Sequence, residues 1–187
     1  NTANYLVEGD EAKGEDARRA VVAVLVALRP DIVALLEVGG EGAAAEIAGR
    51  LEREGLAYPY RSVVAGADEI RRIAVLARHP PLAVHHETAA TYRLDARDVP
   101  LRRGFGVWLF AWNNGYRLRL VAAHLKSKVF HPLGQTDMRR YEARQLRYLI
   151  DDLIATTPDE NLLVVGDFND TPDSSPLSTL IARQRNP

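Results

Sequence analysis

The chain has 187 residues and no cysteine, so disulfide bonds, thiolate metal sites and a cysteine nucleophile are excluded. Its composition, 47% hydrophobic and 26% charged, is typical of a globular protein, and its length predicts one domain over residues 1–187. The formal net charge of −1 gives no global attraction to nucleic acid or to an acidic membrane, so an anionic partner needs a local patch or a bound cation.

No apolar run approaches the roughly 18 residues that a membrane span needs, since the longest run ends at Leu28 before Arg29 and Pro30. The chain also does not begin with the basic and apolar leader of a signal peptide. We therefore expect a soluble protein, and the sequence leaves its compartment and oligomeric state open.

The first half of the chain predicts alternating helices and strands. Apolar residues at helical spacing predict helices over Gly14–Leu28 and Glu41–Glu54. Short apolar runs predict strands over Asp31–Leu36, Arg61–Val64 and Ile73–Ala77. The first of these strands ends at Glu37.

The second half begins with a segment, His79–Arg103, that has little pattern and is predicted to be a loop insertion. Strands are then predicted over Gly104–Trp112 and Tyr116–Leu125, joined by Asn113-Asn114-Gly115, a strong hairpin signal. A long helix is predicted over Thr136–Ile154 and a short one over Pro176–Ile181.

Between these helices, Leu162–Val165 predicts a short strand that is buried on both faces and ends abruptly at Gly166. Asp167 and Asn169 follow two residues apart, so an extended backbone would point both side chains the same way. The alternative is an Asx-type turn, because Asp and Asn readily bond their own backbone.

Polar side chains therefore follow three predicted strands: Glu37, His124, and Asp167 with Asn169. Taken singly, each has an ordinary explanation as a solvated or hydrogen-bonded residue. Their recurrence at strand ends favours metal or phosphate chemistry in a crevice at one edge of a sheet.

Three motifs resemble those of the endonuclease/exonuclease/phosphatase superfamily of metal-dependent phosphoesterases. They are Asp31–Glu37, Val121–Ser127 and Gly166–Asp170, in that family's order and spacing. Ile73–Arg78 resembles a further strand, and Asn1 resembles the asparagine that follows the family's first strand. The resemblance implies a four-layer α/β sandwich, with two facing mixed sheets and helices outside.

The resemblance also implies roles for five residues. Asn1 and Glu37 would bind Mg²⁺ or Mn²⁺, which prefer oxygen ligands. Asp167 would orient or deprotonate the attacking water, Asn169 would bond the phosphoryl oxygens, and His124 would contact the scissile phosphate.

Three further residues are weaker candidates. Lys126 and Arg103 could contact phosphate, although a solvated surface charge is the more ordinary explanation for each. Asp170 is expected to act through its neighbours. His85-His86-Glu87 could also bind a metal, but adjacent side chains diverge on a strand, which favours solvated residues.

The chain departs from the family at both ends. Family members carry an Asp-His pair near the C-terminus, whereas no histidine follows His131 here, and no strand precedes Asn1. We expect the chain to lack the family's first strand and its C-terminal strands, and residues 1–187 alone to be poorly active.

The implied function is Mg²⁺-dependent hydrolysis of a phosphodiester or phosphomonoester by in-line attack of water. Nucleic acid is one candidate substrate, for which the arginines within Arg93–Arg103 and Arg139–Arg144 could supply phosphate contacts. The alternatives are a phosphodiesterase or phosphatase acting on a lipid head group or small molecule, and a non-catalytic binding module that lacks the terminal Asp-His pair.

Overall fold

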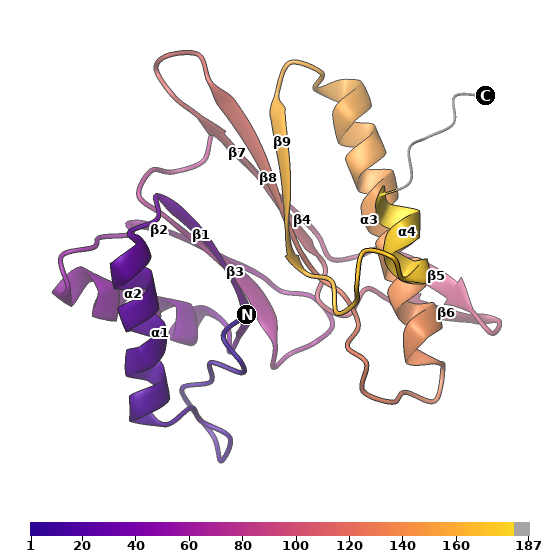
Figure 1. Cartoon of the computed structure of the whole chain (residues 1–187), viewed down its shortest axis with the longest axis horizontal. Coiled ribbons are helices and arrows are strands. Elements are labelled where there is room, and N and C mark those ends of the chain that lie inside the picture. The colour runs from indigo at the N-terminus through magenta and orange to yellow at the C-terminus, as the bar shows by residue number, and fades with distance from the viewer. Residues whose placement is uncertain (182–187) are drawn as a thin grey trace.

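The computed structural model describes residues 1–181 (Figure 1). The helices are α1 (Glu15–Leu28), α2 (Glu41–Arg53), α3 (Gln135–Thr156) and α4 (Ser175–Ile181). The strands are β1 (Ile32–Val38), β2 (Tyr60–Val64), β3 (Arg72–Ala77), β4 (Ala83–Glu87), β5 (Thr91–Leu94), β6 (Arg97–Pro100), β7 (Phe105–Ala111), β8 (Arg117–His124) and β9 (Asn161–Asp167).

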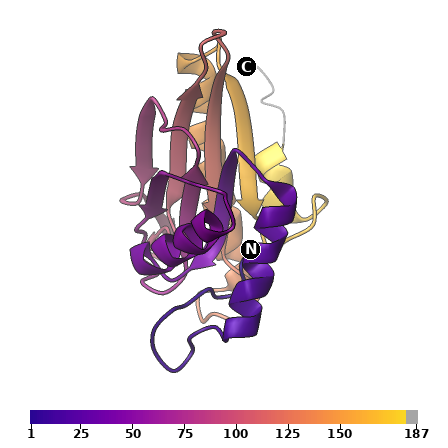
Figure 2. The same ribbon diagram turned by 90° about the vertical axis from the view of Figure 1, so that its left-hand side faces the viewer.

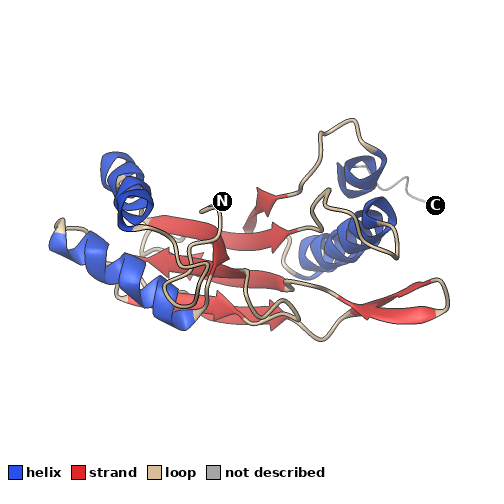
Figure 3. Cartoon of the chain, turned by 90° about the horizontal axis from the view of Figure 1, so that it is seen from below, coloured by secondary structure: helices blue, strands red, loops and turns tan. Residues whose placement is uncertain are grey.

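The molecule is a four-layer α/β sandwich, as the motif resemblance implied. One sheet has the strand order β1-β3-β2, the facing sheet has the order β4-β7-β8-β9, and β5 and β6 form a separate ribbon. Helices α1 and α2 cover the outer face of the first sheet, and α3 and α4 cover that of the second (Figures 1 and 3). Figure 2 views the molecule from the α1 and α2 side, with the strands behind the helices.

A separate apolar cluster fills each space between neighbouring layers, because side chains alternate between the two faces of a strand. In β3, Ala74 and Leu76 join the cluster beneath α1 and α2, whereas Ile73 and Val75 join the cluster between the sheets. Trp108, which is fully buried, belongs to the latter cluster. Both sheets are therefore anchored on two faces.

The arrangement of β8 and β9 determines where the predicted polar strand ends lie. The two strands are parallel, and their register places His124 opposite Asp167. Gly166 lies so close to β8 that a Cβ atom there would be 1.9 Å from the Ala123 carbonyl oxygen, so this position requires glycine. The predicted hairpin between β7 and β8 is confirmed.

The prediction of a loop insertion over residues 79–103 is wrong, because the segment contains β4, β5 and β6. β4 is a half-exposed strand that pairs with β7, so it lacks a clear apolar alternation. β5 and β6 are joined at Asp95 and Ala96, which have φ values of 48° and 61°. Turns with two such residues usually contain Asn or Gly, and this one was therefore missed.

The prediction that β9 is buried on both faces is also wrong. Among the described residues β9 is the last strand of its sheet, and Leu163 on its inner face is 47% exposed. The opposite sheet ends at β1 and does not cover that side chain.

None of the helices within residues 1–181 has both the length and the apolar character that a membrane crossing requires.

Candidate active site

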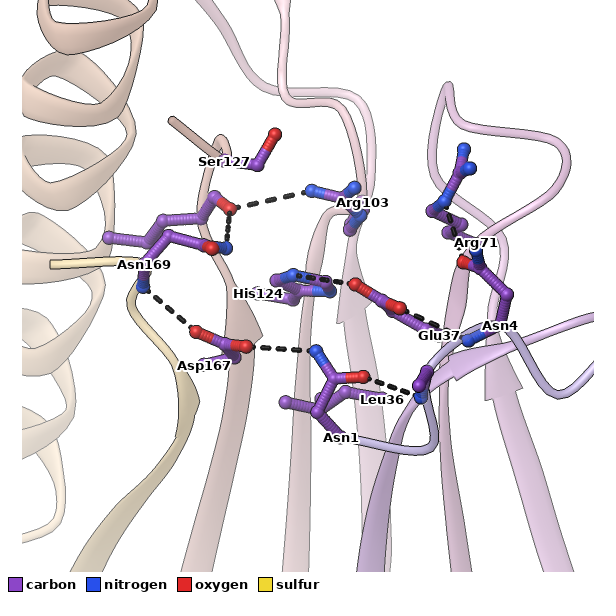
Figure 4. A network of polar contacts seen from close by, with 12 residues as sticks. Asn1, Asn4, Leu36, Glu37, Arg71, Arg103, His124, Ser127, Asp167 and Asn169 are labelled. Atoms are coloured by element: carbon purple, nitrogen blue, oxygen red, sulfur yellow. Dashed lines mark hydrogen bonds and ion pairs between the residues drawn. The ribbon is translucent and has the colours of Figure 1, made fainter. Parts of the chain in front are cut away.

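The structure brings together three side chains that follow different strands (Figure 4). Glu37 lies near the end of β1, His124 ends β8 and Asp167 ends β9. The Nε2 atom of His124 is 3.7 Å from Oε1 of Glu37, and Asp167 lies on the opposite side of the imidazole ring (Figure 4). Two carboxylates therefore flank one histidine at the same end of both sheets.

The backbone around Glu37 is held in an unusual conformation by the first residues of the chain. Glu37 has a φ of 62°, in the left-handed region that costs energy for a residue with a Cβ. Thr2 N–H donates to Leu36 O and Tyr5 N–H donates to Glu37 O, each at 2.8 Å. The Asn4 N–H donates to Oε2 of Glu37 at 3.1 Å. The N-terminal segment thus fixes both the backbone and the carboxylate of Glu37.

Asn1 links that segment to Asp167. Its Nδ2 donates to Oδ2 of Asp167 at 2.8 Å, and its Oδ1 accepts the Ala3 N–H at 2.8 Å. Asn1 therefore lies beside the Asp167 carboxylate, and its amide oxygen already accepts one hydrogen bond.

Asp167 and Asn169 lie in an Asx-type turn, so the expectation of an extended backbone between them is wrong. Asn169 has a φ of 54°, and its N–H donates to Oδ1 of Asp167 at 2.9 Å. Both side chains still face the site (Figure 4), and Nδ2 of Asn169 donates to Leu125 O at 2.9 Å. Burial would raise the pKa of Asp167, but the hydrogen bonds from Asn1 and the Asn169 backbone outweigh burial and lower it. The carboxylate is therefore ionised near neutral pH.

His124 is almost completely buried and uncharged. Burial, followed by the positive charge of Arg103, lowers the pKa of His124 from its ordinary value to about 4. Within residues 1–181 its Nδ1 atom has no hydrogen-bond partner. Buried polar atoms normally have partners, so this atom is available to a bound group.

Arg103 and Lys126 are buried, so the ordinary explanation as solvated surface charges is wrong for both. Arg103 contacts Asp68 Oδ2 at 3.5 Å and Leu125 O at 3.4 Å. Its Nε atom is buried without a partner among the described residues, and the side chain faces the space above His124 (Figure 4). The Lys126 ammonium instead holds the next loop, through Ser127 O and Oγ at 3.2 Å and Val129 O at 2.9 Å.

Asp170 forms a buried ion pair that the sequence did not predict. Its Oδ2 is 2.7 Å from Nη2 of Arg139, a residue of α3 that is 3% exposed, and its Oδ1 is 3.2 Å from Nζ of Lys128. The prediction that Arg139 could contact phosphate is therefore replaced by a structural role in this ion pair. Glu142, which accepts the Lys126 N–H at 2.5 Å, was missed because a helical pattern gives no sign that a charged residue is buried.

The residues around Glu37 fit a hard cation that retains several waters. Glu37, Asn1 and Asp167 supply oxygen atoms, and Oε1 of Glu37 has only the long contact to His124. No lysine or arginine among the described residues pairs with Glu37, which leaves its charge for another cation. The same residues contain no cluster of three His, Cys, Asp or Glu side chains that could enclose a metal. A Mg²⁺ site does not require such a cluster, because one or two carboxylates together with water molecules can complete its coordination.

The His85-His86-Glu87 segment lies elsewhere, on β4. His86 is 3.0 Å from Ser62 Oγ and packs edge-on against Trp108, with ring centroids 5.6 Å apart. His85 is exposed. The two imidazoles point to opposite faces, which agrees with the expectation that adjacent strand residues diverge.

Residues 3–187 match the sequence model of the Endonuclease/Exonuclease/phosphatase family, and the chain belongs to this family. The resemblance inferred from its motifs is confirmed. No curated protein sequence matches the chain.

Solved structures of the same fold include the human Nocturnin catalytic domain with bound sulfate, with a TM-score of 0.65 and 19% identity over 94% of this chain and 66% of that one. Sphingomyelinase C from Streptomyces griseocarneus has a TM-score of 0.65 and 20% identity, over 90% of this chain and 61% of that one. Truncated TDP2 from Caenorhabditis elegans has a TM-score of 0.55 and 17% identity, over 82% of this chain and 55% of that one. The chain thus spans less than two thirds of each of these structures.

Proposed function

We propose that this protein is a Mg²⁺- or Mn²⁺-dependent phosphoesterase that hydrolyses a phosphodiester or phosphomonoester by in-line attack of water. The observation that carries the proposal is the buried His124 between the carboxylates of Glu37 and Asp167. Membership of the Endonuclease/Exonuclease/phosphatase family supports the same reaction class.

Each residue has a role that its contacts support. The ionised Asp167 accepts a hydrogen bond from the attacking water and orients it, and it can take up the proton that the water loses. His124, through its unpaired Nδ1, and the buried Arg103 donate hydrogen bonds to the phosphoryl oxygens as negative charge develops. The second N–H of the Asn169 amide is also free to donate, since only one is needed for Leu125 O.

Glu37 and Asn1 would hold the metal ion, which when bound neutralises charge on the phosphate and on the leaving group. The N–H of Asn4 keeps the Glu37 carboxylate in place for this task.

The proposal is tested by the turnover of bis-(p-nitrophenyl) phosphate by the full-length protein, with Mg²⁺ and with EDTA. We expect Mg²⁺-dependent turnover that Asp167→Asn lowers by at least about 100-fold, because an amide oxygen cannot take up the proton that the attacking water loses. Asp159→Asn is the matched control, since Asp159 is exposed in the loop before β9. Turnover that is insensitive to EDTA, or equal in the two variants, would show that the site is assigned wrongly.

A substrate panel separates the candidate classes. Plasmid DNA, RNA, inositol phosphates and sphingomyelin are incubated with the full-length protein and Mg²⁺. Nucleic acid is our first candidate substrate because two arginines, Arg71 and Arg103, lie on one side of the site (Figure 4). Hydrolysis of sphingomyelin alone would instead favour the lipid head-group alternative, and binding without turnover of any compound would favour the non-catalytic module.

A further inference from the structure

Three arginine residues, Arg71, Arg102 and Arg103, contact a single buried carboxylate, that of Asp68. Oδ2 of Asp68 is 3.2 Å from Nη2 of Arg102 and 3.5 Å from Nη2 of Arg103. Oδ1 of Asp68 accepts the backbone N–H of Arg71 at 3.0 Å. The Asp68 side chain is only 4% exposed, so its contacts join the segment before β3 firmly to the segment before β7.

Arg71 differs from the other two arginines because its guanidinium has no ion-pair partner among residues 1–181. Its Nε donates to Oδ1 of Asn4 at 2.8 Å, and the Asn4 N–H in turn donates to the Glu37 carboxylate. Asn4 itself has a left-handed φ of 59°. Figure 4 shows Arg71 beside Asn4 and Glu37, on the side of the site away from Asp167 and Asn169. The arginine is therefore held in place through Nε, and its Nη groups have no partner among residues 1–181.

A guanidinium presents several N–H groups in one plane, a geometry that matches two oxygens of a phosphate. An anchored but unpaired guanidinium at the edge of a site for anionic substrates is suited to this contact. Arg103 is already deep in the site, where it faces His124. Arg71 is less buried than Arg103 and lies on the far side of Glu37 from His124 (Figure 4), so we assign it to a different phosphate.

We propose that Arg71 binds a second phosphate group of the substrate, next to the phosphate that is cleaved. This inference rests on the proposed function, which places the scissile phosphate between His124 and Asp167. It favours substrates with consecutive phosphates, as in a nucleic-acid strand, over those with one phosphate, as in a choline lipid head group.

The test compares two ligands that differ by one phosphodiester, the thymidine dinucleotide TpT and the trinucleotide TpTpT. Dissociation constants are measured by calorimetry with Mg²⁺ and the full-length protein carrying Asp167→Asn, so that hydrolysis does not consume the ligand. TpTpT has two phosphodiesters, and either of them can occupy the site. This statistical effect alone makes TpTpT bind twofold more tightly than TpT. We expect a preference of about tenfold, since a hydrogen bond between charged groups contributes about that factor.

Adding Arg71→Gln should reduce the preference to about twofold, whereas Arg71→Lys should retain part of it. Arg61→Gln is the matched control, because Arg61 is exposed on β2 towards the other end of the sheet, and it should leave the preference intact. The nucleotide pTpT, which has a terminal phosphate and one phosphodiester, shows whether the second phosphate must be a phosphodiester. A preference for pTpT equal to that for TpTpT indicates that a terminal phosphate suffices.

Two results would overturn the inference while leaving the proposed function standing. One is equal binding of TpT and TpTpT before Arg71 is changed. The other is an equal loss of affinity for both ligands in Arg71→Gln, which would mean that Arg71 acts only by holding Asn4 and Glu37. If neither nucleotide binds at all and the bis-(p-nitrophenyl) phosphate assay is also negative, the proposed function fails together with the inference.

Discussion

Buried charges lie directly behind the site, although charged side chains usually remain in water. Lys126, Arg139 and Glu142 are each at most 3% exposed. They bind the chain that follows His124, since Glu142 accepts the Lys126 N–H and Arg139 donates to Lys126 O at 3.1 Å. The stability of this region should therefore depend on the charge of each residue.

Glu142 provides a prediction about pH. Burial raises the pKa of Glu142 from its ordinary value near 4.5 to about 7, against the opposing effect of its hydrogen bond from Lys126 N–H and the charge of Arg103. A carboxyl whose pKa is raised on folding stabilises the fold at low pH, and this contribution is lost as pH rises from about 4.5 through 7. Glu142→Gln keeps an acceptor for Lys126 N–H without the charge.

We expect the Gln variant to be more stable than the wild type at pH 8, by an amount of the order of 2 kcal/mol, and to lose this advantage at pH 5. Urea unfolding of both chains at the two pH values measures the difference. A constant difference between the variants at both pH values would refute the prediction.

At the scale of elements, Arg139 connects α3 to the ends of β8 and β9. Its Nε donates to Oδ2 of Asp170 at 2.8 Å while Nη1 reaches Lys126 O. The helix is therefore attached by one side chain to both strands that carry His124 and Asp167.

Removing this side chain leaves the Asp170 carboxylate, which is 9% exposed, with Lys128 as its one remaining ion-pair partner among the described residues. Arg139→Ala is expected to lower the free energy of unfolding by about 3–5 kcal/mol, as for other broken buried pairs. The neighbouring Arg140 is the control, since it pairs with Asp137 on the exposed face of α3, and Arg140→Ala should cost less than about 1 kcal/mol. Equal losses for the two variants in urea unfolding would disprove a special role for Arg139.

The elements that carry the site were predictable, because apolar runs that stop at polar residues are local patterns. Glu37, His124 and Asp167 were located in this way, and the structure brings them together. The burial of Arg103 and Lys126 was not predictable, since it depends on Asp68 and on backbone carbonyls that come from other parts of the chain. The β5–β6 ribbon was missed because its turn does not use the usual residues.

At the scale of the whole molecule, both large sheets end in a strand at the same side of the sandwich. β1 and β9 are the last strands of their sheets within residues 1–181. Tyr5 forms a bridge to Val38 at the end of β1, whereas Leu163 of β9 is exposed. Open strand edges with exposed apolar side chains tend to pair with other chains.

We therefore expect residues 1–187 to associate as concentration rises, and Leu163→Lys to weaken this association because lysine on an edge strand opposes pairing. Leu28→Lys is the control, since Leu28 is equally apolar and 70% exposed at the end of α1, away from any strand edge. Sedimentation velocity over a range of concentrations measures the association. A monomer at all concentrations, or the same effect of both substitutions, would rule the prediction out.

We propose that Glu37 helps to hold a divalent metal beside His124 and Asp167. Titration of residues 1–187 with Mn²⁺, followed by electron paramagnetic resonance, tests it without requiring turnover. We predict one bound Mn²⁺ per chain that Mg²⁺ displaces, with affinity reduced at least about tenfold in Glu37→Gln. Glu41→Gln, an exposed position in the first turn of α2, should leave the affinity unchanged. Equal Mn²⁺ affinity in the wild type and Glu37→Gln would show that Glu37 does not bind the metal.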